Sequence, residues 1–420
     1  MMSIKPRRVS ATLESLVPSD HELRRIDQLL DFSSIRDQVH SLYSATGRPS
    51  IDPAVILRLF FLLFFYGIRS ERRLLQEVRY NLAYRWFVGY DLHEPLPHHC
   101  VLTKARARWG LPIFRQLFER IVRRCLRQGL VEGHTTFLDA TVLRANASRD
   151  SLREPLVRPA RVRLNELLYS KTDPEAGLVS RDGQRAFFGY KVHRALDARA
   201  RIITETLVTS GDLVEQKYLT ALVEGQRHRG IDPIEVVADA NYGTIENYRY
   251  LLDQGKVVHI KRRQSGRRLD RFVLEDFRYD AQRDRLICPQ GKVLRMVGAT
   301  AHGKRYRARG TDCRACPVKA RCTDATILGR TVQRPWEQAA IEVVKEHLET
   351  ERAAEHLKKR QVICEGSFAE AKNFHHFGRA LYRGKWKMQV QDYLIAVVQN
   401  VKRLLRWELQ AGVKLSLGAA

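Results

Sequence analysis

Two aspartates stand at the ends of short apolar segments, where a metal ion could bind. Asp139 lies in HTTFLDAT (134–141), whose β-branched and apolar residues are typical of a buried strand. Asp239 ends a similar run in EVVADANYGT (235–244), just before a turn. If the two strands are neighbours, their carboxylates converge and repel each other unless a cation joins them. We therefore expect Asp139 and Asp239 to share a hard divalent cation, Mg²⁺ or Mn²⁺.

A third acidic residue, Glu365, lies in KKRQVICEGSFAEAKNFHHFGR (358–379). On a helix, Glu365, Phe368 and Lys372 fall near one face, because they follow an i, i+3, i+7 spacing. Glu365 would then complete a site for two metal ions, and Lys372 would hold a phosphate. Two ions bridged by carboxylates suit the cleavage of a phosphodiester, which makes nucleic acid the expected substrate.

Each acid also has a simpler interpretation. Asp139 could cap the end of a strand, and Asp239 could only form the turn that follows it. Glu365 could be an ordinary solvated residue of a helix. Glu370, five residues further on, is a rival for its role.

The elements that must position these residues follow from hydrophobic periodicity. A helix is predicted over 215–228, a long helix over 337–380 and another near 388–410. Residues 144–186 show little periodicity and are predicted to form a long excursion that touches DNA. Strands are predicted over 134–143, 187–196, 201–209 and 234–239. This mixed order predicts an α/β layer with a partly antiparallel sheet.

The charge of the chain points to a polyanionic partner. The 420 residues include 73 Lys+Arg and 47 Asp+Glu, which gives a net charge of +26. Basic side chains displace the counterions around phosphates, so nucleic acid is the favoured partner over a merely arginine-rich composition. Within the helical segment 51–130, arginines gather at 69–73, 104–108 and 120–124. We interpret this segment as a DNA-binding helical region, the alternative being the solvated face of a helical bundle.

No membrane segment is expected. The longest apolar run, 54–68, contains Arg58 and is shorter than the roughly 20 residues that a bilayer span needs, so it predicts a buried helix. The basic residues Lys5, Arg7 and Arg8 are followed by mixed polar sequence and not by the apolar core of a signal peptide. We therefore expect a reducing cytoplasm and no disulfide framework among the seven cysteines.

Four cysteines are spaced as metal ligands. A C-P-x-G segment and a C-x₂-C-x₅-C segment contain Cys288, Cys313, Cys316 and Cys322. This spacing indicates one structural Zn²⁺, since four thiolates leave no open position for catalysis. The alternative is four reduced cysteines without metal. Cys100, Cys125 and Cys364 have no partner at metal spacing and are interpreted as core residues.

Several segments together resemble the DDE transposases of bacterial insertion sequences. These are LDAT (138–141), FGYKVH (188–193), VADANYGTIENY (237–248), RQVICEGSFAEAK (360–372) and RGKWKMQVQDYLIAVVQNVKRL (383–404). The segment GRPSIDPAVILRLFFLLFFYGIRSERRLLQEV (47–78) resembles the helical N-terminal domain of the same proteins. The resemblance covers most of the chain.

The resemblance implies an α/β fold, with a ribonuclease H-like mixed sheet flanked by helices, an all-helical N-terminal domain and a small Cys-containing insertion. On this basis the chain divides into four parts. They are a helical N-terminal DNA-binding region (1–130), the first part of the catalytic core (131–261), a Cys/Arg-rich insertion (262–335), and a second part of the core with the catalytic Glu helix and C-terminal helix (336–420).

The resemblance also implies roles for single residues. The first aspartate of the family falls on Asp139, the second on Asp239 and the glutamate on Glu365. Lys372 matches the lysine that often follows the glutamate by seven positions. Arg360 lies five positions before Glu365, one earlier than the tightest form of the family pattern, and Leu357 stands where a tyrosine is often found.

Two further residues belong to FGYKVH. Lys191 and His193 alternate with Val192 along a predicted strand and therefore point the same way. They are expected to contact DNA near the metal ions or to support the site, and Lys372 and Arg360 to bind DNA directly.

The implied activity is that of a transposase: hydrolysis of a strand at each transposon end, then attack of the freed 3′-hydroxyl on target DNA. The implied partners are the terminal inverted repeats, the target DNA and a second copy of the chain on DNA, in the cytoplasm of a bacterium, associated with the nucleoid. The alternatives are a metal-dependent nuclease without strand transfer and a non-catalytic DNA-binding regulator. Inverted repeats bordering the gene would favour transposition.

Overall fold

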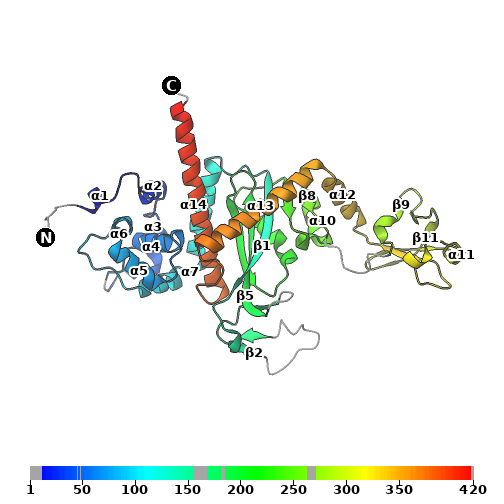
Figure 1. Cartoon of the computed structure of the whole chain (residues 1–420), viewed down its shortest axis with the longest axis horizontal. Coiled ribbons are helices and arrows are strands. Elements are labelled where there is room, and N and C mark those ends of the chain that lie inside the picture. The colour runs from blue at the N-terminus through cyan, green and yellow to red at the C-terminus, as the bar shows by residue number, and fades with distance from the viewer. Residues whose placement is uncertain are drawn as a thin grey trace, which may run out of the picture. The chain divides into compact units, whose positions relative to one another are not determined.

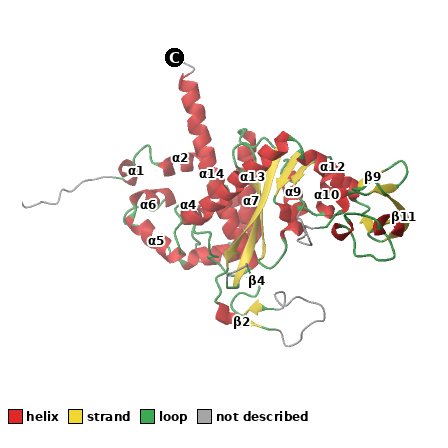
Figure 2. Cartoon of the chain, turned by 45° about the vertical axis from the view of Figure 1, so that its right-hand side comes forward, coloured by secondary structure: helices red, strands yellow, loops and turns green. Residues whose placement is uncertain are grey.

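The computed structural model describes residues 12–44, 46–47, 49–154, 168–180, 185–262 and 271–417. They form two compact units. Figure 1 shows the chain coloured by residue number and Figure 2 by secondary structure. Unit 1 comprises Met1–Val237 and Lys358–Ala420, and unit 2 comprises Ala238–Leu357. None of the helices in the described part of the chain combines the length and the apolar character that a bilayer span requires.

Unit 1 begins with helices. They are α1 (Leu13–Leu16), α2 (Glu22–Leu29), α3 (Ile35–Val39), α4 (Pro53–Phe65), α5 (Glu71–Tyr80), α6 (Leu82–Val88) and α7 (Cys100–Arg127). Helix α4 is the apolar run of the sequence, and ten of its residues are buried, as predicted. Asp52 caps it by accepting a hydrogen bond from the Ala54 amide, and Pro53 occupies the first turn, where its missing N–H costs nothing.

The sheet of unit 1 has the strand order β4-β5-β1-β7, with β6 also paired to β5. Its strands are β1 (Thr135–Arg144), β4 (Gly177–Val179), β5 (Phe187–Asp197), β6 (Ile203–Ser210) and β7 (Glu235–Ala238). Strand β5 is antiparallel to β1, β4 and β6. Asp139 lies opposite Arg194 in the β1–β5 pair, and Ala140 lies opposite His193. Because side chains alternate along a strand, Asp139 and Arg194 share one face of the sheet and His193 lies on the other.

Two long helices cover the Asp139 face. They are α13 (Glu351–Phe374) and α14 (Lys385–Leu417), which Figure 1 draws in orange and red. The buried guanidinium of Arg194 joins both helices to the sheet. It forms an ion pair of 2.6 Å with Asp392 of α14 and donates hydrogen bonds to Gln399 of α14 and Ser367 of α13. Burying a charge is costly without such partners, so this contact fixes α13 and α14 on the sheet.

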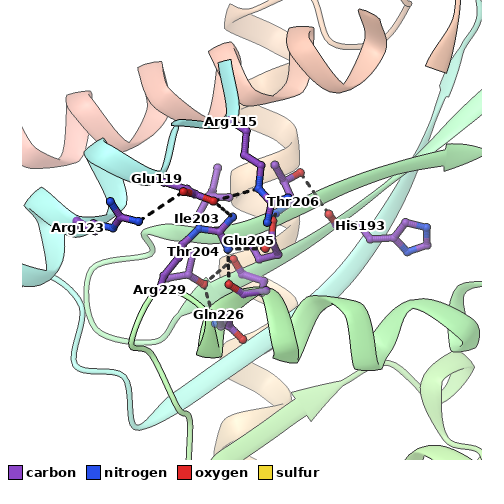
Figure 3. A network of polar contacts seen from close by, with 12 residues as sticks. Arg115, Glu119, Arg123, His193, Ile203, Thr204, Glu205, Thr206, Gln226 and Arg229 are labelled. Atoms are coloured by element: carbon purple, nitrogen blue, oxygen red, sulfur yellow. Dashed lines mark hydrogen bonds and ion pairs between the residues drawn. The ribbon is translucent and has the colours of Figure 1, made fainter. Parts of the chain in front are cut away.

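The opposite face is covered by α9 (Leu219–Arg227), whose Gln226 amide donates to the hydroxyls of Thr136 and Thr204. Figure 3 shows the polar network beside it. Arg229 pairs there with Glu205 of β6 and with Glu119 of α7, at 3.3 Å in the second case. The network ties the helical N-terminal part of unit 1 to its sheet.

The four predicted strands correspond to β1, β5, β6 and β7, and the helix predicted near 388–410 lies within α14. The helix predicted over 215–228 is a 3₁₀ turn, η3 (Glu215–Tyr218), followed by α9. The segment 144–186 contains the short strands β2 (Leu152–Arg153) and β3 (Tyr169–Ser170) besides β4. Its residues 155–167 and 181–184 lie outside the described part of the chain.

The single long helix predicted over 337–380 is wrong, because two helices occupy the segment. They are α12 (Gln338–Leu348) and α13, which begins at Glu351. Thr350 causes the break. Its hydroxyl donates to the His347 carbonyl and accepts from the Ala353 amide, which ends one helix and caps the next.

Unit 2 contains α10 (Ile245–Asp253), β8 (Val257–Ile260) and α12, which packs on both of them. It also contains an antiparallel sheet of order β13-β12-β11-β10-β9. The strands are β9 (Arg278–Asp280), β10 (Arg285–Ile287), β11 (Val293–Thr300), β12 (Gly303–Ala308) and β13 (Thr331–Arg334). One face of this sheet packs on a small core that includes Leu286, Leu294 and Tyr306.

Candidate active site on β1 and α13

Asp139 has a cationic partner in the structure. Its Oδ2 lies 3.3 Å from Nη1 of Arg360 on α13, and its Oδ1 accepts a hydrogen bond of 2.8 Å from the Ala140 amide. The Arg360 and Asp139 side chains are 14% and 19% exposed. The carboxylate therefore lies at the edge of the core, where an ion pair is held but water can still reach it.

A second contact joins the same strand and helix. Nζ of Lys372 donates a hydrogen bond of 2.8 Å to the hydroxyl of Thr141, two residues beyond Asp139. Arg360 and Lys372 are separated by about 18 Å along an ideal helix. Glu365 lies between them along α13, exposed, and two turns before Lys372 on the same face.

Cys364, the residue before Glu365, also lies near Asp139. Cys364 is fully buried, and burial raises its pKa well above the ordinary value, with the negative charge of Asp139 adding to the effect. The segment of α13 around Glu365 is therefore close enough to Asp139 to sense its charge. The structure thus brings Arg360 to Asp139 and Lys372 to Thr141, with Glu365 between these two contacts along α13.

The rival acid Glu370 is engaged elsewhere. It forms an ion pair of 2.9 Å with Arg403 of α14 and lies on another side of α13 from Glu365. This contact belongs to the packing of α13 on α14, which favours Glu365 as the acid of the site.

Asp239 follows β7, the strand that lies beside β1 in the sheet. Its carboxylate caps the short turn η4 (Ala240–Tyr242) by accepting a hydrogen bond of 2.7 Å from the Ala240 amide. Gly243 ends the turn. Only glycine fits at this position, because a Cβ atom there would lie 2.2 Å from the Lys261 carbonyl oxygen. Thr244 then caps α10 by accepting a hydrogen bond from the Asn247 amide.

Lys191 and His193 were expected to contact DNA near the metal ions or to support the site, and the structure places both across the sheet from Asp139. Nζ of Lys191 donates to the Leu213 carbonyl and lies 3.3 Å from the Glu215 carboxylate. His193 is fully buried, and burial lowers its pKa to about 3. Both residues therefore hold β5 against η3 and β6.

Three of the four cysteines of unit 2 belong to its small core or pack against it. Cys322 belongs to the core, and Cys288 and Cys313 pack against it. Burial raises the pKa of the Cys322 thiol, and the nearby Cys313, Cys288 and Cys316 raise it further. Among the described residues, these sulfurs do not form a group of three whose members all lie within 4.8 Å of one another.

Two backbone amides already donate to cysteine sulfurs. The Lys292 amide lies 3.3 Å from Sγ of Cys288, and the Arg330 amide lies 3.4 Å from Sγ of Cys313. Gly291, at φ 74°, closes the first of these turns. The sulfurs of Cys288 and Cys313 therefore each accept a hydrogen bond from the backbone.

Within unit 1, the structure reveals a cluster that the sequence interpretation missed. The ligand atoms of His98, His99 and Cys100, at the start of α7, all lie within 4.8 Å of one another. Cys100 therefore has neighbours at metal spacing, contrary to its interpretation as a core residue. The signal was the run His-His-Cys itself.

Comparison with known proteins identifies the class. A transposase domain (DUF772) matches residues 11–108, and a transposase DDE domain matches residues 287–405. The chain belongs to the DDE transposases, the enzymes of DNA transposition. A solved piggyBac transposase in a synaptic complex with hairpin DNA is 10% identical, with a TM-score of 0.27, and the match covers 89% of this chain and 77% of that one.

Proposed function

We propose that this transposase cuts DNA strands at the ends of its element and joins them to target DNA, in a reaction that requires two Mg²⁺ or Mn²⁺ ions. The ligands would be Asp139, Asp239 and Glu365. The observation that supports this most directly is the pair of contacts from α13 to β1, Arg360 to Asp139 and Lys372 to Thr141. They hold the helix of Glu365 against the strand of Asp139, while Asp239 follows the neighbouring strand.

The residues fit hard divalent cations. Asp139 and Glu365 offer carboxylate oxygens, and Asp139 is held by a cation even in this structure, at a position that water reaches. Bound ions would supply an activated water and stabilise the leaving oxygen of the phosphodiester. Arg360 orients the Asp139 carboxylate, and its guanidinium can turn to a DNA phosphate when that carboxylate binds an ion.

Lys372 has a different part in this proposal. Its ammonium group is exposed and oriented by the Thr141 hydroxyl, so it can hold a phosphate oxygen of the strand being cut. The net charge of +26 supports DNA as the wider partner. Because two transposon ends must be joined, two copies of the chain on one DNA complex are expected.

Cleavage of a labelled duplex with the element's own ends, in Mg²⁺, tests the proposal. The substitutions Asp139→Asn and Glu365→Gln should each lower the rate by more than about 100-fold, because each removes a metal ligand. Glu370→Gln is the matched control and should keep most of the activity. A product joined to target DNA distinguishes a transposase from a nuclease. Full cleavage by Asp139→Asn would refute the metal site, and binding without cleavage by the wild type would favour a regulator.

We also propose that Cys288, Cys313, Cys316 and Cys322 bind one structural Zn²⁺. The amide hydrogen bonds to Cys288 and Cys313 support this, and metal binding would draw the four sulfurs together around the core of unit 2. Protein purified without chelator should contain one zinc ion per chain, as measured by inductively coupled plasma mass spectrometry. Cys316→Ser should lose the zinc, and Cys125→Ser, in a helix of unit 1, should keep it. A wild-type protein without zinc would contradict this proposal.

A further inference from the structure

Three arginines lie side by side across the sheet of unit 2. Arg285 of β10 is opposite Arg295 of β11, and Arg295 is opposite Arg307 of β12. Opposite residues of antiparallel strands point to the same face, with Cβ atoms about 4.5–5.5 Å apart. Their neighbours in sequence, Leu286, Leu294 and Tyr306, point to the core, so the arginines occupy the other face. We call Arg285, Arg295 and Arg307 the arginine row.

The positive charge of the row is only partly compensated. Arg285 pairs with Asp280 of β9 at 2.8 Å. Arg307 donates to the uncharged Thr331 hydroxyl, and Arg295 is exposed. Within the described ranges, neither Arg295 nor Arg307 forms an ion pair. Like charges directly opposite each other destabilise a sheet, so this arrangement costs folding free energy and is explained by a ligand of opposite charge.

A groove of about 480 Å³ adjoins the row. Its basic lining residues are Lys292, Arg295, Arg307 and Arg309, and its acidic lining residue is Asp312. Lys292 belongs to the turn whose amide donates to Cys288, so the turn that holds this thiol also positions one wall of the groove. Four cations against one anion around this groove suit a chain of phosphates better than a single small anion.

We propose that the arginine row and its groove bind the sugar–phosphate backbone of duplex DNA. This contact lies on unit 2 and uses none of the residues proposed to hold the metal ions, and it rests on the proposed action of the chain on DNA. It anchors the duplex through its phosphates, because four cations lie around one groove.

The test uses the full-length protein with Arg295 and Arg307 both changed to alanine. Binding to a labelled duplex is measured by fluorescence anisotropy over a series of salt concentrations. Each phosphate contact contributes about 0.9 to the slope of log K against log salt, so the double variant should lose nearly 2 from that slope. Its affinity at low salt should fall at least about tenfold. Arg283→Ala, in the exposed turn between β9 and β10, removes one equal charge and should change the slope little.

Thermal unfolding separates a binding role from a structural one. Because the double variant relieves repulsion, its unfolding temperature should stay equal to that of the wild type or rise, while DNA binding weakens. Arg295→Lys keeps the charge and should keep the salt dependence. An unchanged slope in the double variant, an equal loss in Arg283→Ala, or tighter binding to duplex RNA would overturn the inference. Failure of the wild type to bind any DNA would instead refute the proposed function.

Discussion

Two arginine–aspartate pairs lie on the same face of the unit 1 sheet, and they differ in almost every other respect. Arg194 and Asp392 are 2.6 Å apart and fully buried. Arg360 and Asp139 are 3.3 Å apart, and their side chains are 14% and 19% exposed. Asp139 and Arg194 are direct cross-strand neighbours, so a few ångströms separate one kind of ion pair from the other.

The partners explain the difference. Asp392 also accepts a hydrogen bond from Thr206, and Arg194 donates to Gln399 and lies against the ring of Phe368. Both side chains are fully buried and have several protein partners, so this pair serves to hold the fold together. The Arg360–Asp139 pair is reached by water, and under the proposed function a metal ion would take the place of Arg360 beside Asp139. Burial and the number of partners therefore distinguish charges that build the core from charges that are available for chemistry.

The largest expected effect breaks the buried pair. Asp392→Asn leaves the Arg194 guanidinium buried without a counter-charge and should lower the free energy of unfolding by about 3–5 kcal/mol. Asp139→Asn, which removes the exchangeable pair, should cost less than about 1 kcal/mol. Urea denaturation followed by circular dichroism measures both. Equal losses in the free energy of unfolding would contradict the distinction between a structural ion pair and a water-accessible one.

A smaller effect is expected at the second contact between β1 and α13, which joins Lys372 and Thr141. Lys372→Met removes a cation that we propose holds a phosphate and should slow end cleavage by about 100-fold. Thr141→Val removes only the hydroxyl that orients Lys372 and should slow cleavage less than about tenfold. Single-turnover rates with saturating DNA measure both. A greater loss in Thr141→Val than in Lys372→Met would argue that the contact is structural.

The smallest effect concerns pH and the other face of the sheet. Burial lowers the pKa of His193 to about 3, against about 6.5 in the unfolded chain. The unfolded state therefore binds the proton first, and stability is lost as the pH falls below about 6.5. Between pH 7 and pH 5 the loss from this residue should approach about 2 kcal/mol. His193→Gln should flatten the pH dependence of the urea midpoint, and an unaltered profile would contradict the assignment.

The sequence was sufficient for the strands of Asp139 and Asp239 and for the helix of Glu365 and Lys372, because apolar patterns and turn residues are local signals. It could not show which face of the sheet His193 occupies relative to Asp139. That depends on the register of β5 against β1, which is a pairing between distant segments.

Other features could not be predicted from the sequence for similar reasons. The hydrophobic pattern continues through Thr350, so the break between α12 and α13 depends on the hydrogen bonds of a single side chain. The arginine row exists only once β10, β11 and β12 are in register. Arg360 was noted as a family position, but its pairing with Asp139 requires the packing of α13 on the sheet.

The Arg194–Asp392 pair joins residues 198 positions apart in the chain. During synthesis, the ribosome must therefore add almost half of the protein after Arg194 before its partner exists. Contacts of such sequence separation form late and slow the completion of folding. A nascent chain that lacks α14 keeps a charged residue in an unfinished core, so an interrupted copy of the gene should yield protein that is degraded and not a partly active enzyme.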